Sequence, residues 1–319
     1  MPDPKAFPPS GSRRDAGRDR VVGKDRLEAF NEHRKLLFGI AYRMLGSVAD
    51  TEDMLQETYL RWQQAPDREI HSPRAFLVTI VSRLCLNHLQ SARVRREEYF
   101  GEWLPEPLLT EEHDSGLGVL AEVEVDDSLS FAFLVLLERL TPMERAVFLL
   151  REVFEYEYAE IADILDQSEA NCRQLLRRGR QHVAENRPRF NPSPQQRERL
   201  MKEFLQATAG GNLRRLVELL SSDVALHSDG GGKGPALPVV IQGADKVARA
   251  LIGASRKFVP ANIVTRLASI NGELGAISYH EGRPFSVITL DIADGRIRGV
   301  YIVSNPEKFA HFAPPPATA

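Results

Sequence analysis

The sequence predicts two all-α units followed by an α+β domain. Apolar residues recur at helical spacing through residues 26–93, and the same spacing returns through residues 129–183. Later in the chain, short segments rich in β-branched and aromatic residues are separated by the hairpin signals Asn-Gly at 271–272 and Asp-Gly at 294–295. A chain of 319 residues is long enough to hold two or three domains.

Composition argues against a membrane or secreted protein. With 43% hydrophobic and 27% charged residues, the chain is typical of soluble globular proteins, and its longest apolar run, Phe131–Leu137, is far short of the ~20 residues of a membrane span. The first residues lack the apolar core of a secretory signal, so residues 1–25 are predicted to be a disordered lead. Cys85 and Cys172 lie inside helical patterns without metal-ligand spacing. We expect a cytoplasmic protein with no membrane partner, no metal and no cofactor.

Three amphipathic helices are predicted in the first unit. The first ends at Gly46, and the second, VADTEDMLQETYLRWQQ, carries acidic residues in its early turns. The third begins with Ser72 as N-cap and Pro73 at the first helical position, and it ends in a basic cluster. In the second unit, Thr141 and Glu144 form a predicted capping box at the start of another helix.

Residues 97–127 are predicted to be an acidic linker, because they include eleven Asp and Glu residues and no Lys or Arg. Glycines and prolines interrupt the segment, as in an extended connection. One interpretation is a solvated, disordered spacer. Within it, the sequence WLPEP sets Trp103 beside prolines as a stiff apolar anchor, which predicts that this part docks on another surface.

The strongest functional motif is a predicted helix-turn-helix. Its first helix covers Glu157–Leu165, and Ser168 caps the second helix after a short turn. One side of the second helix is apolar, with Cys172, Leu175, Leu176, Gly179 and Val183. The opposite side carries amide and guanidinium groups, from Asn171, Arg173, Gln174, Arg177, Arg178, Arg180 and Gln181. Such groups contact base edges and phosphates, so the helix is predicted to read DNA; a solvated basic face is the alternative.

The rest of residues 26–187 resembles one family, the extracytoplasmic-function group of sigma-70-type sigma factors. VADTEDMLQETYLRW is similar to the region 2 helix that binds the clamp of RNA polymerase. SPRAFLVTIVSRLCLNHL and the following RVRR resemble the segment that contacts the −10 element. LTPMERAVFLLREV and the helix-turn-helix resemble region 4, which reads the −35 element. The resemblance implies core RNA polymerase, through its β′ clamp and β flap, and promoter DNA as partners.

Three sets of contact residues follow from the resemblance. Polymerase contacts fall on Asp50, Asp53, Gln56 and Glu57, −10 contacts on Arg83, Asn87, His88, Arg93, Arg95 and Arg96, and −35 contacts on Asn171, Arg173, Gln174, Arg177, Arg178 and Arg180. A solvated helix face is the alternative for the first two sets. The resemblance also gives the acidic linker a second interpretation, in which its charge imitates a nucleic-acid backbone and it occupies the polymerase channel until RNA displaces it.

Three further motifs resemble a subgroup of these sigma factors that has a SnoaL-like C-terminal domain. They are GEWLPEPL in the linker, DGGGK at 229–233 and NPEKF at 305–309. The likeness implies an α+β domain of the NTF2-like cone fold, which controls the sigma factor from within the same chain. The regulatory contacts are then expected from Trp103, Leu104, Pro105, Asp229, Gly230, Gly231, Gly232, Lys233, Asn305, Pro306, Glu307 and Lys308.

The glycine run of DGGGK also has a competing interpretation as a phosphate-binding loop. Gly234 stands where such a loop needs Ser or Thr, and Pro235 and Pro238 oppose a helix directly after it. Bare backbone does allow another surface to approach closely. We therefore expect a docking loop, at a domain contact or at the rim of a pocket.

Two rival functions stay open on the sequence. A SnoaL-like isomerase or cyclase fused to a DNA-binding unit would use a buried acid or histidine, with His227, Asp229, His280 and Asp291 as candidates, although a fold does not imply its best-known activity. A repressor with a ligand pocket would have no use for a polymerase-binding helix. We expect a sigma factor without catalytic residues; a small ligand in the C-terminal domain stays open. The predicted parts are the disordered lead (1–25), region 2 (26–96), the acidic linker (97–128), region 4 (129–190) and the SnoaL-like domain (195–313).

Overall fold

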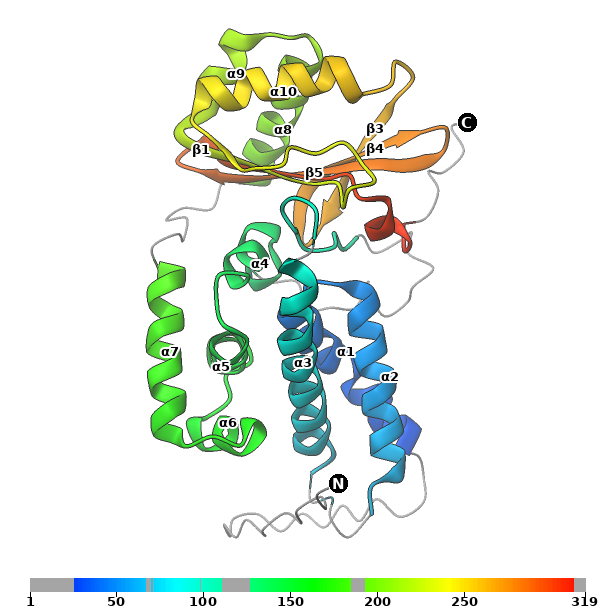
Figure 1. The fold of residues 1–319 in the computed structure, drawn as a ribbon, viewed down its shortest axis with the longest axis vertical. Coiled ribbons are helices and arrows are strands. Elements are labelled where there is room, and N and C mark those ends of the chain that lie inside the picture. Colours follow the sequence, from blue (N-terminus) through cyan, green and yellow to red (C-terminus); the bar gives the residue numbers. More distant parts are fainter. Residues whose placement is uncertain are drawn as a thin grey trace.

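The structure is a computed structural model that describes residues 26–66, 70, 72–97, 99–110, 127–184 and 193–312. It has a helical half and an α+β half, and the sheet of the second half lies across one end of the helical half (Figure 1). The predicted lead, residues 1–25, lies outside the described residues. Within the described part, no helix is both long and apolar enough to cross a membrane.

The helical half contains the helices predicted for both all-α units. Before the linker come α1 (Arg26–Leu45), α2 (Val48–Gln64) and α3 (Pro73–Glu97), and after it come η3 (Asp127–Leu129), α4 (Phe131–Leu137), α5 (Pro142–Glu152), α6 (Tyr158–Leu165) and α7 (Glu169–Ala184). Gly46, with φ +66°, ends α1 as predicted. The capping box at the start of α5 is confirmed, because Thr141 and Glu144 each bond the other's backbone.

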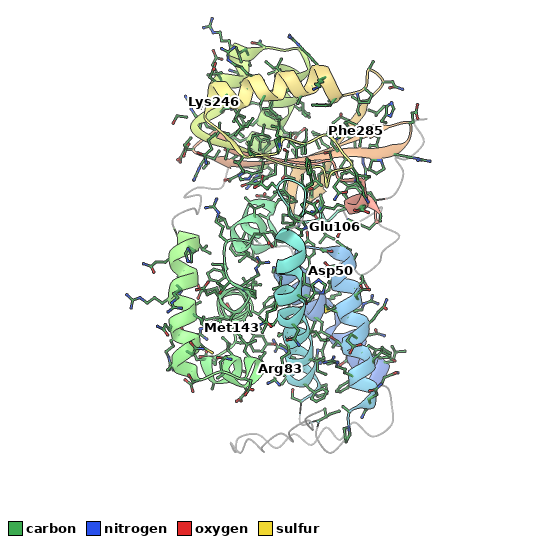
Figure 2. The ribbon with its side chains drawn as sticks, in the orientation of Figure 1. Asp50, Arg83, Glu106, Met143, Lys246 and Phe285 are labelled. Atoms are coloured by element: carbon green, nitrogen blue, oxygen red, sulfur yellow. The ribbon has the colours of Figure 1, made fainter. Side chains whose placement is uncertain are left out.

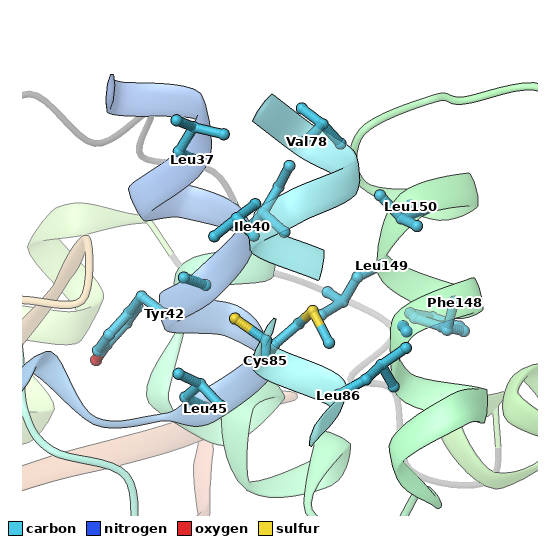
Figure 3. Close-up of a cluster of buried hydrophobic side chains, with 14 of the residues drawn as sticks. Leu37, Ile40, Tyr42, Leu45, Val78, Cys85, Leu86, Phe148, Leu149 and Leu150 are labelled. Carbon is cyan, nitrogen blue, oxygen red and sulfur yellow. The ribbon is translucent and has the colours of Figure 1, made fainter. Parts of the chain in front are cut away.

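One hydrophobic core joins the two all-α units. Side chains from α1, α3 and α5 point toward one another (Figure 3), and six of them without exposed surface are Leu37, Ile40, Val78, Cys85, Leu149 and Leu150. Complete burial of one aliphatic side chain stabilises by about 1.5–3 kcal/mol. The sequence predicts each apolar stripe separately, but the structure shows that the stripes of the two units are packed against each other.

The C-terminal half is an α+β domain built on one six-stranded sheet. Its elements are α8 (Pro194–Ala209), α9 (Leu213–Leu219), β1 (Leu220–Asp229), β2 (Ile241–Gln242), α10 (Ala244–Phe258), β3 (Val264–Ile270), β4 (Glu273–His280), β5 (Arg283–Ala293), β6 (Arg296–Val303) and η4 (Pro306–Phe309). The strand order is β2-β1-β6-β5-β4-β3. β1 and β6 are parallel, and the other neighbours are antiparallel.

The two faces of this sheet have different neighbours. Helices α8, α9 and α10 cover one face and share an apolar core with it (Figure 1). The opposite, outer face carries a second apolar cluster, where Ile277 and Val287 meet Leu104 of the linker, Phe131 of α4 and Phe309 of η4. This is the α+β domain that the sequence predicts, and its outer face contacts the rest of the chain.

The hairpin turns agree with the prediction, while two strand predictions are incomplete. Asn271 and Asp294 have φ +53° and +52°, and a glycine of positive φ follows each, as a two-residue hairpin turn requires. β1 begins at Leu220, and its polar start gives no alternation signal. β2 spans only Ile241–Gln242, which is too short for any periodicity.

Candidate functional site

The apolar side of α7 fixes this helix on the helical half. Cys172, Leu176 and Val183 are buried, and Gly179 lies against the ring of Phe148 on α5. At the start of α7, the Asn171 amide donates to the Ser168 hydroxyl at 3.2 Å, which is the predicted N-cap. With α6 before it, α7 forms the predicted helix-turn-helix, and its polar side faces away from the core.

Three side chains of the predicted −35 set on α7 have no partner among the described residues. Gln174, Arg177 and Arg178 are exposed, and none of them makes a hydrogen bond or ion pair within the described part of the chain. Asn171 is half-buried, and its side-chain Nδ2 donates to Gln167 Oε1 at 2.8 Å. α7 also lies at the outer edge of the molecule, away from the sheet (Figure 1). This row of donors is therefore accessible to DNA.

Two other arginines of the predicted −35 set are held by neighbours. Arg173 pairs with Glu169 at 2.6 Å and lies over the ring of Tyr158, 4.8 Å from its centroid. Arg180 pairs with Glu152 of α5 at 2.7 Å. Exposed pairs of this kind contribute only about 0–1 kcal/mol, so DNA phosphates can replace the carboxylates.

Of the predicted polymerase-binding residues on α2, two are exposed and a third forms an ion pair. Asp53 and Gln56 are exposed, whereas Glu57 accepts a bond from Arg61 at 2.7 Å, one helical turn later. The fourth predicted residue, Asp50, lies 3.5 Å from His88 of α3. Asp50 and His88, which the sequence assigns to different partners, thus contact each other in this structure.

One of the predicted −10 residues on α3, Arg83, is already bonded to another helix of the chain. Arg83 donates from Nε to the Ile164 carbonyl at 2.7 Å and from Nη2 to the Asp163 carbonyl at 2.9 Å. These carbonyls belong to the last turn of α6, where helical partners are missing. Asn87 is exposed. The side chains of Arg93, Arg95 and Arg96 lie outside the described residues.

Other arginines also connect α1–α3 to α5–α6. The Arg43 guanidinium lies 5.6 Å from the ring centroid of Phe154, and that of Arg74 lies 5.5 Å from the ring centroid of Tyr156. Arg145 of α5 is almost completely buried, and its Nη1 donates to the backbone carbonyl of Met44 in α1 at 2.7 Å. Together with the shared apolar core, these contacts hold the two predicted promoter-reading units in one compact body.

The linker crosses the space between the sheet and the corner joining α1 to α2. Residues 104–108 are buried there, and Figure 2 shows Glu106 between the two halves. The Glu106 amide donates to the Gly46 carbonyl, and its carboxylate accepts from the Val48 amide at the start of α2, each at 2.7 Å. Trp103 covers Gly46 so closely that a Cβ atom there would lie 2.9 Å from its ring.

Asp229 is the centre of the contact between the linker and the C-terminal domain. This carboxylate has no exposed surface, and it accepts four hydrogen bonds. The donors are Tyr99 Oη at 2.6 Å, the Leu104 amide at 2.9 Å, the Gly231 amide at 3.0 Å and Lys308 Nζ at 2.6 Å. Burial and the Asp229 carboxylate raise the pKa of Tyr99, so its phenol keeps the proton that it donates.

The cationic partner of Asp229 is Lys308, a residue of the NPEKF motif. Its ammonium also donates to the Leu104 carbonyl and lies 4.2 Å from the ring centroid of Trp103. Lys233, the cation that follows the glycine run, instead pairs with Glu307 at the surface. A buried ion pair is tolerated only when both members are fully bonded, which is the arrangement at Asp229.

The glycine run allows two loops to meet. Gly231 has φ +56°, and a Cβ atom built on it would lie 2.3 Å from Asn305 Nδ2, so only glycine fits. Asn305 Nδ2 in turn donates to the Tyr99 hydroxyl at 3.0 Å. The DGGGK and NPEKF segments are therefore in contact with each other and, through Tyr99, with the start of the linker.

The four candidate catalytic residues of the sequence have separate surroundings. His227 Nδ1 lies 2.7 Å from Glu102 of the linker, and Asp229 is the docking carboxylate described above. Burial raises the pKa of Asp291, with opposing effects from two arginines. His280 ends β4 beside a turn. Two of the four candidates thus hold the linker.

Sequence reasoning missed several residues that the docking uses. Tyr99, Glu106 and Asn271 all make buried or partly buried hydrogen bonds between segments far apart in the chain. Glu106 lies inside the quoted WLPEP motif, so its position was a usable signal. No local pattern identifies a partner for Tyr99, whereas Asn271 was recognised only as a turn residue.

Comparison with known proteins decides the family. Two family models match the helical half, Sigma-70 region 2 over residues 29–95 and Sigma-70, region 4 over residues 130–183. Over 298 residues the chain is 39% identical to the ECF RNA polymerase sigma factor SigJ of Mycobacterium tuberculosis. The matched segment covers 89% of this chain and 92% of that protein. The chain belongs to the extracytoplasmic-function sigma factors.

Other similarities extend through the C-terminal domain of this sigma factor. It is 32% identical over 285 residues to the probable ECF RNA polymerase sigma factor SigI of Mycobacterium tuberculosis, covering 87% of this chain and 92% of that one. The crystal structure of Mycobacterium tuberculosis SigJ matches with a TM-score of 0.72 at 34% identity, over 90% of this chain and 99% of that chain. The predicted family is confirmed: α1–α3 form region 2, α4–α7 form region 4, and the α+β domain follows them.

Proposed function

We propose that this sigma factor directs promoter-specific initiation in an open form, and that its C-terminal domain stabilises a closed form. The observation that carries the proposal is the Asp229 cluster. One buried carboxylate of the C-terminal domain bonds the linker at Tyr99 and Leu104 and bonds Lys308 of NPEKF. The linker in turn is bonded to the start of α2 through Glu106. The domain therefore acts on region 2 by holding the linker in place.

The compact packing of regions 2 and 4 supports the need for opening. The −10 and −35 elements are separate sites on the promoter, and each base pair between them adds about 3.4 Å of B-DNA. In the closed form, α3 packs directly on α5 and α6, and Arg83 bonds the end of α6. Two readers that share one hydrophobic core cannot span the distance between the two elements. Opening also frees Arg83 for the −10 strand.

The partners are proposed surface by surface. Asp53 and Gln56 of α2 face the β′ clamp, and region 4 meets the β flap. Gln174, Arg177 and Arg178 of α7 contact bases and phosphates of the −35 element, because they are exposed donors without described partners. We propose no reaction for the C-terminal domain, since His227 and Asp229 bind the linker. A small ligand of that domain stays a prediction.

Transcription by core RNA polymerase on a library of genomic fragments tests the proposal. The full chain is compared with core enzyme alone, with a chain ending at Pro192 and with Asp229→Ala. We expect promoter-specific transcripts only when the sigma factor is present, and a changed level with both variants. Lys233→Ala is the matched control, because its ion pair with Glu307 is exposed. Equal transcription from the full chain, the shortened chain and Asp229→Ala would exclude control by the C-terminal domain.

A further inference from the structure

The β3–β4 turn contains a buried polar residue that the Asp229 cluster does not include. Asn271 occupies the first turn position, with φ +53°, and has no exposed surface. The equivalent residue of the β5–β6 turn, Asp294, has nearly the same φ of +52° but is exposed. Hairpin turns normally face water, so burial of Asn271 needs a reason beyond turn formation.

Every polar group of the Asn271 side chain has a partner in another segment. Its Nδ2 donates to the Tyr42 hydroxyl of α1 at 2.7 Å, and its Oδ1 accepts from the Leu108 amide of the linker at 3.0 Å. The Asn271 backbone amide donates to the Leu108 carbonyl at 2.7 Å. One turn residue thus bonds both the linker and region 2.

Tyr42 completes this network from the side of region 2. Its hydroxyl donates to the Glu106 carbonyl of the linker at 2.7 Å and accepts from Asn271. Figure 3 shows the Tyr42 oxygen directed away from the apolar side chains of α3 and α5. Burial raises the pKa of Tyr42, which keeps the phenol protonated as a donor. Removing either side chain leaves buried polar groups unpaired, which is costly.

The linker also pairs with the edge of the sheet beside this turn. β3 is the last strand of the sheet, and Leu109 forms an antiparallel bridge with Ile270. The Thr110 amide donates to the Ser269 carbonyl at 3.0 Å, and the Gly272 amide donates to the Thr110 hydroxyl at 2.9 Å. A peptide that adds to a sheet edge in this way is recognised through its backbone.

We propose that the β3 edge and its turn are a second binding surface for the linker, occupied by residues 106–110, with Asn271 joining that segment to Tyr42 of region 2. This surface is separate from the Asp229 cluster, which bonds the linker at Tyr99 and Leu104. The inference rests on the proposed closed form. It adds that the linker is attached at this surface as well as at the Asp229 cluster, so that losing one of these two attachments releases mainly the adjacent part of the linker.

Hydrogen exchange of the full-length protein tests the surface directly, with Asn271→Gly and Tyr42→Phe. Glycine accepts the positive φ of the turn, so the first variant removes the side-chain bonds and keeps the hairpin. The second variant lies in region 2 and does not alter the C-terminal domain. We expect each to raise the exchange rates of the Leu108 and Thr110 amides by about tenfold, the effect of losing roughly 1.4 kcal/mol.

Two comparisons make the test specific. Asp294→Gly makes the same kind of change in the exposed hairpin turn, and it should leave linker exchange as in the wild type. The double variant Asn271→Gly/Tyr42→Phe should exceed either single variant by less than the product of the two effects, because both residues belong to one network. Asp229→Ala should raise exchange at Leu104 more than at Leu108.

The outcomes separate this inference from the proposed function. Wild-type exchange at Leu108 and Thr110 in both single variants would overturn the second surface, as would equal release of Leu104 and Leu108 by Asp229→Ala. Unchanged exchange along β3 and β4 in Asn271→Gly confirms that the hairpin is intact, and Tyr42→Phe tests the same bond independently. If linker exchange rises while transcription stays at the wild-type level, the second surface stands and control by the C-terminal domain fails.

Discussion

Lys308 and the arginines of α7 are cations that the sequence assigns to contacts, yet their surroundings are opposite. Lys308 is buried and already bonded to Asp229 and to the Leu104 carbonyl. Arg177 and Arg178 are exposed and have no partner within the described part of the chain. A cation satisfied inside the chain stabilises the present conformation, whereas an exposed row without partners is ready for an external anion. We therefore propose that the first region serves control and the second serves recognition of DNA.

The largest effect is expected from Lys308→Met. It leaves the Asp229 carboxylate buried without its cation, and breaking a buried pair in this way costs about 3–5 kcal/mol. We expect the C-terminal domain to lose its hold on the linker. The measurement is the distance between labels at Lys246→Cys on α10 and Gln64→Cys on α2, since both native cysteines are buried. An unchanged distance distribution, with unchanged linker exchange, would mean that the ion pair does not hold the closed form.

A smaller effect is expected from Arg83→Ala, which removes two bonds from a charged donor to the end of α6. Bonds to charged groups contribute about 1.5–3 kcal/mol each, and partial exposure lowers this, so we expect a net loss of about 2 kcal/mol. Amide exchange in α6 should therefore accelerate. Arg61→Ala, whose pair with Glu57 is exposed, is the control. If α6 exchanges alike in the two variants, Arg83 does not connect regions 2 and 4.

On promoter DNA, Arg177→Ala should weaken binding by about 1–3 kcal/mol if the residue reads a base, and about equally on all sequences if it holds a phosphate. Arg173→Ala should cost less than Arg177→Ala, because Arg173 must first leave Glu169 and Tyr158. Binding titrations of the holoenzyme on cognate and scrambled −35 sequences measure both. Promoter binding at the wild-type level in both variants would exclude α7 as the reader.

The smallest effect is expected from Lys233→Ala. Both members of the Lys233–Glu307 pair are more than half exposed, and such pairs contribute at most about 1 kcal/mol. Interdomain distance and transcription should stay as in the wild type. A response as large as that of Lys308→Met would mean that the surface loop, and not Asp229, is the centre of the contact.

The sequence predicted the parts of this fold that depend on local signals. The cap at Thr141, the stop at Gly46, the two faces of α7 and the Asn271-Gly272 turn all follow from residues within a few positions of each other. Such signals act at short range, so they are visible in a single chain. The docking motifs are also short stretches of sequence, and the resemblance to the family identified them.

The sequence could not show which partners these residues have across the chain. Lys233 and Lys308 are both among the predicted regulatory contacts, but the sequence does not show that the partner of Asp229 is Lys308, 79 positions later. The resemblance assigned Arg83 to the −10 element, and the sequence did not show that Arg83 bonds the end of α6 in this structure. The common core of regions 2 and 4 was also missed, because an apolar stripe does not specify which other stripe covers it.

The shared core of α1, α3 and α5 limits how long an open molecule can persist. Separating the regions would place Leu149, Leu150 and Val78 in water at once, and large exposed apolar patches promote association and aggregation. An opened chain must therefore reclose quickly or be covered by another protein. In a cell, this would leave almost no reserve of free, active sigma factor. The number of transcribing complexes would then depend on how often the protein meets core polymerase and not on the total amount of the protein.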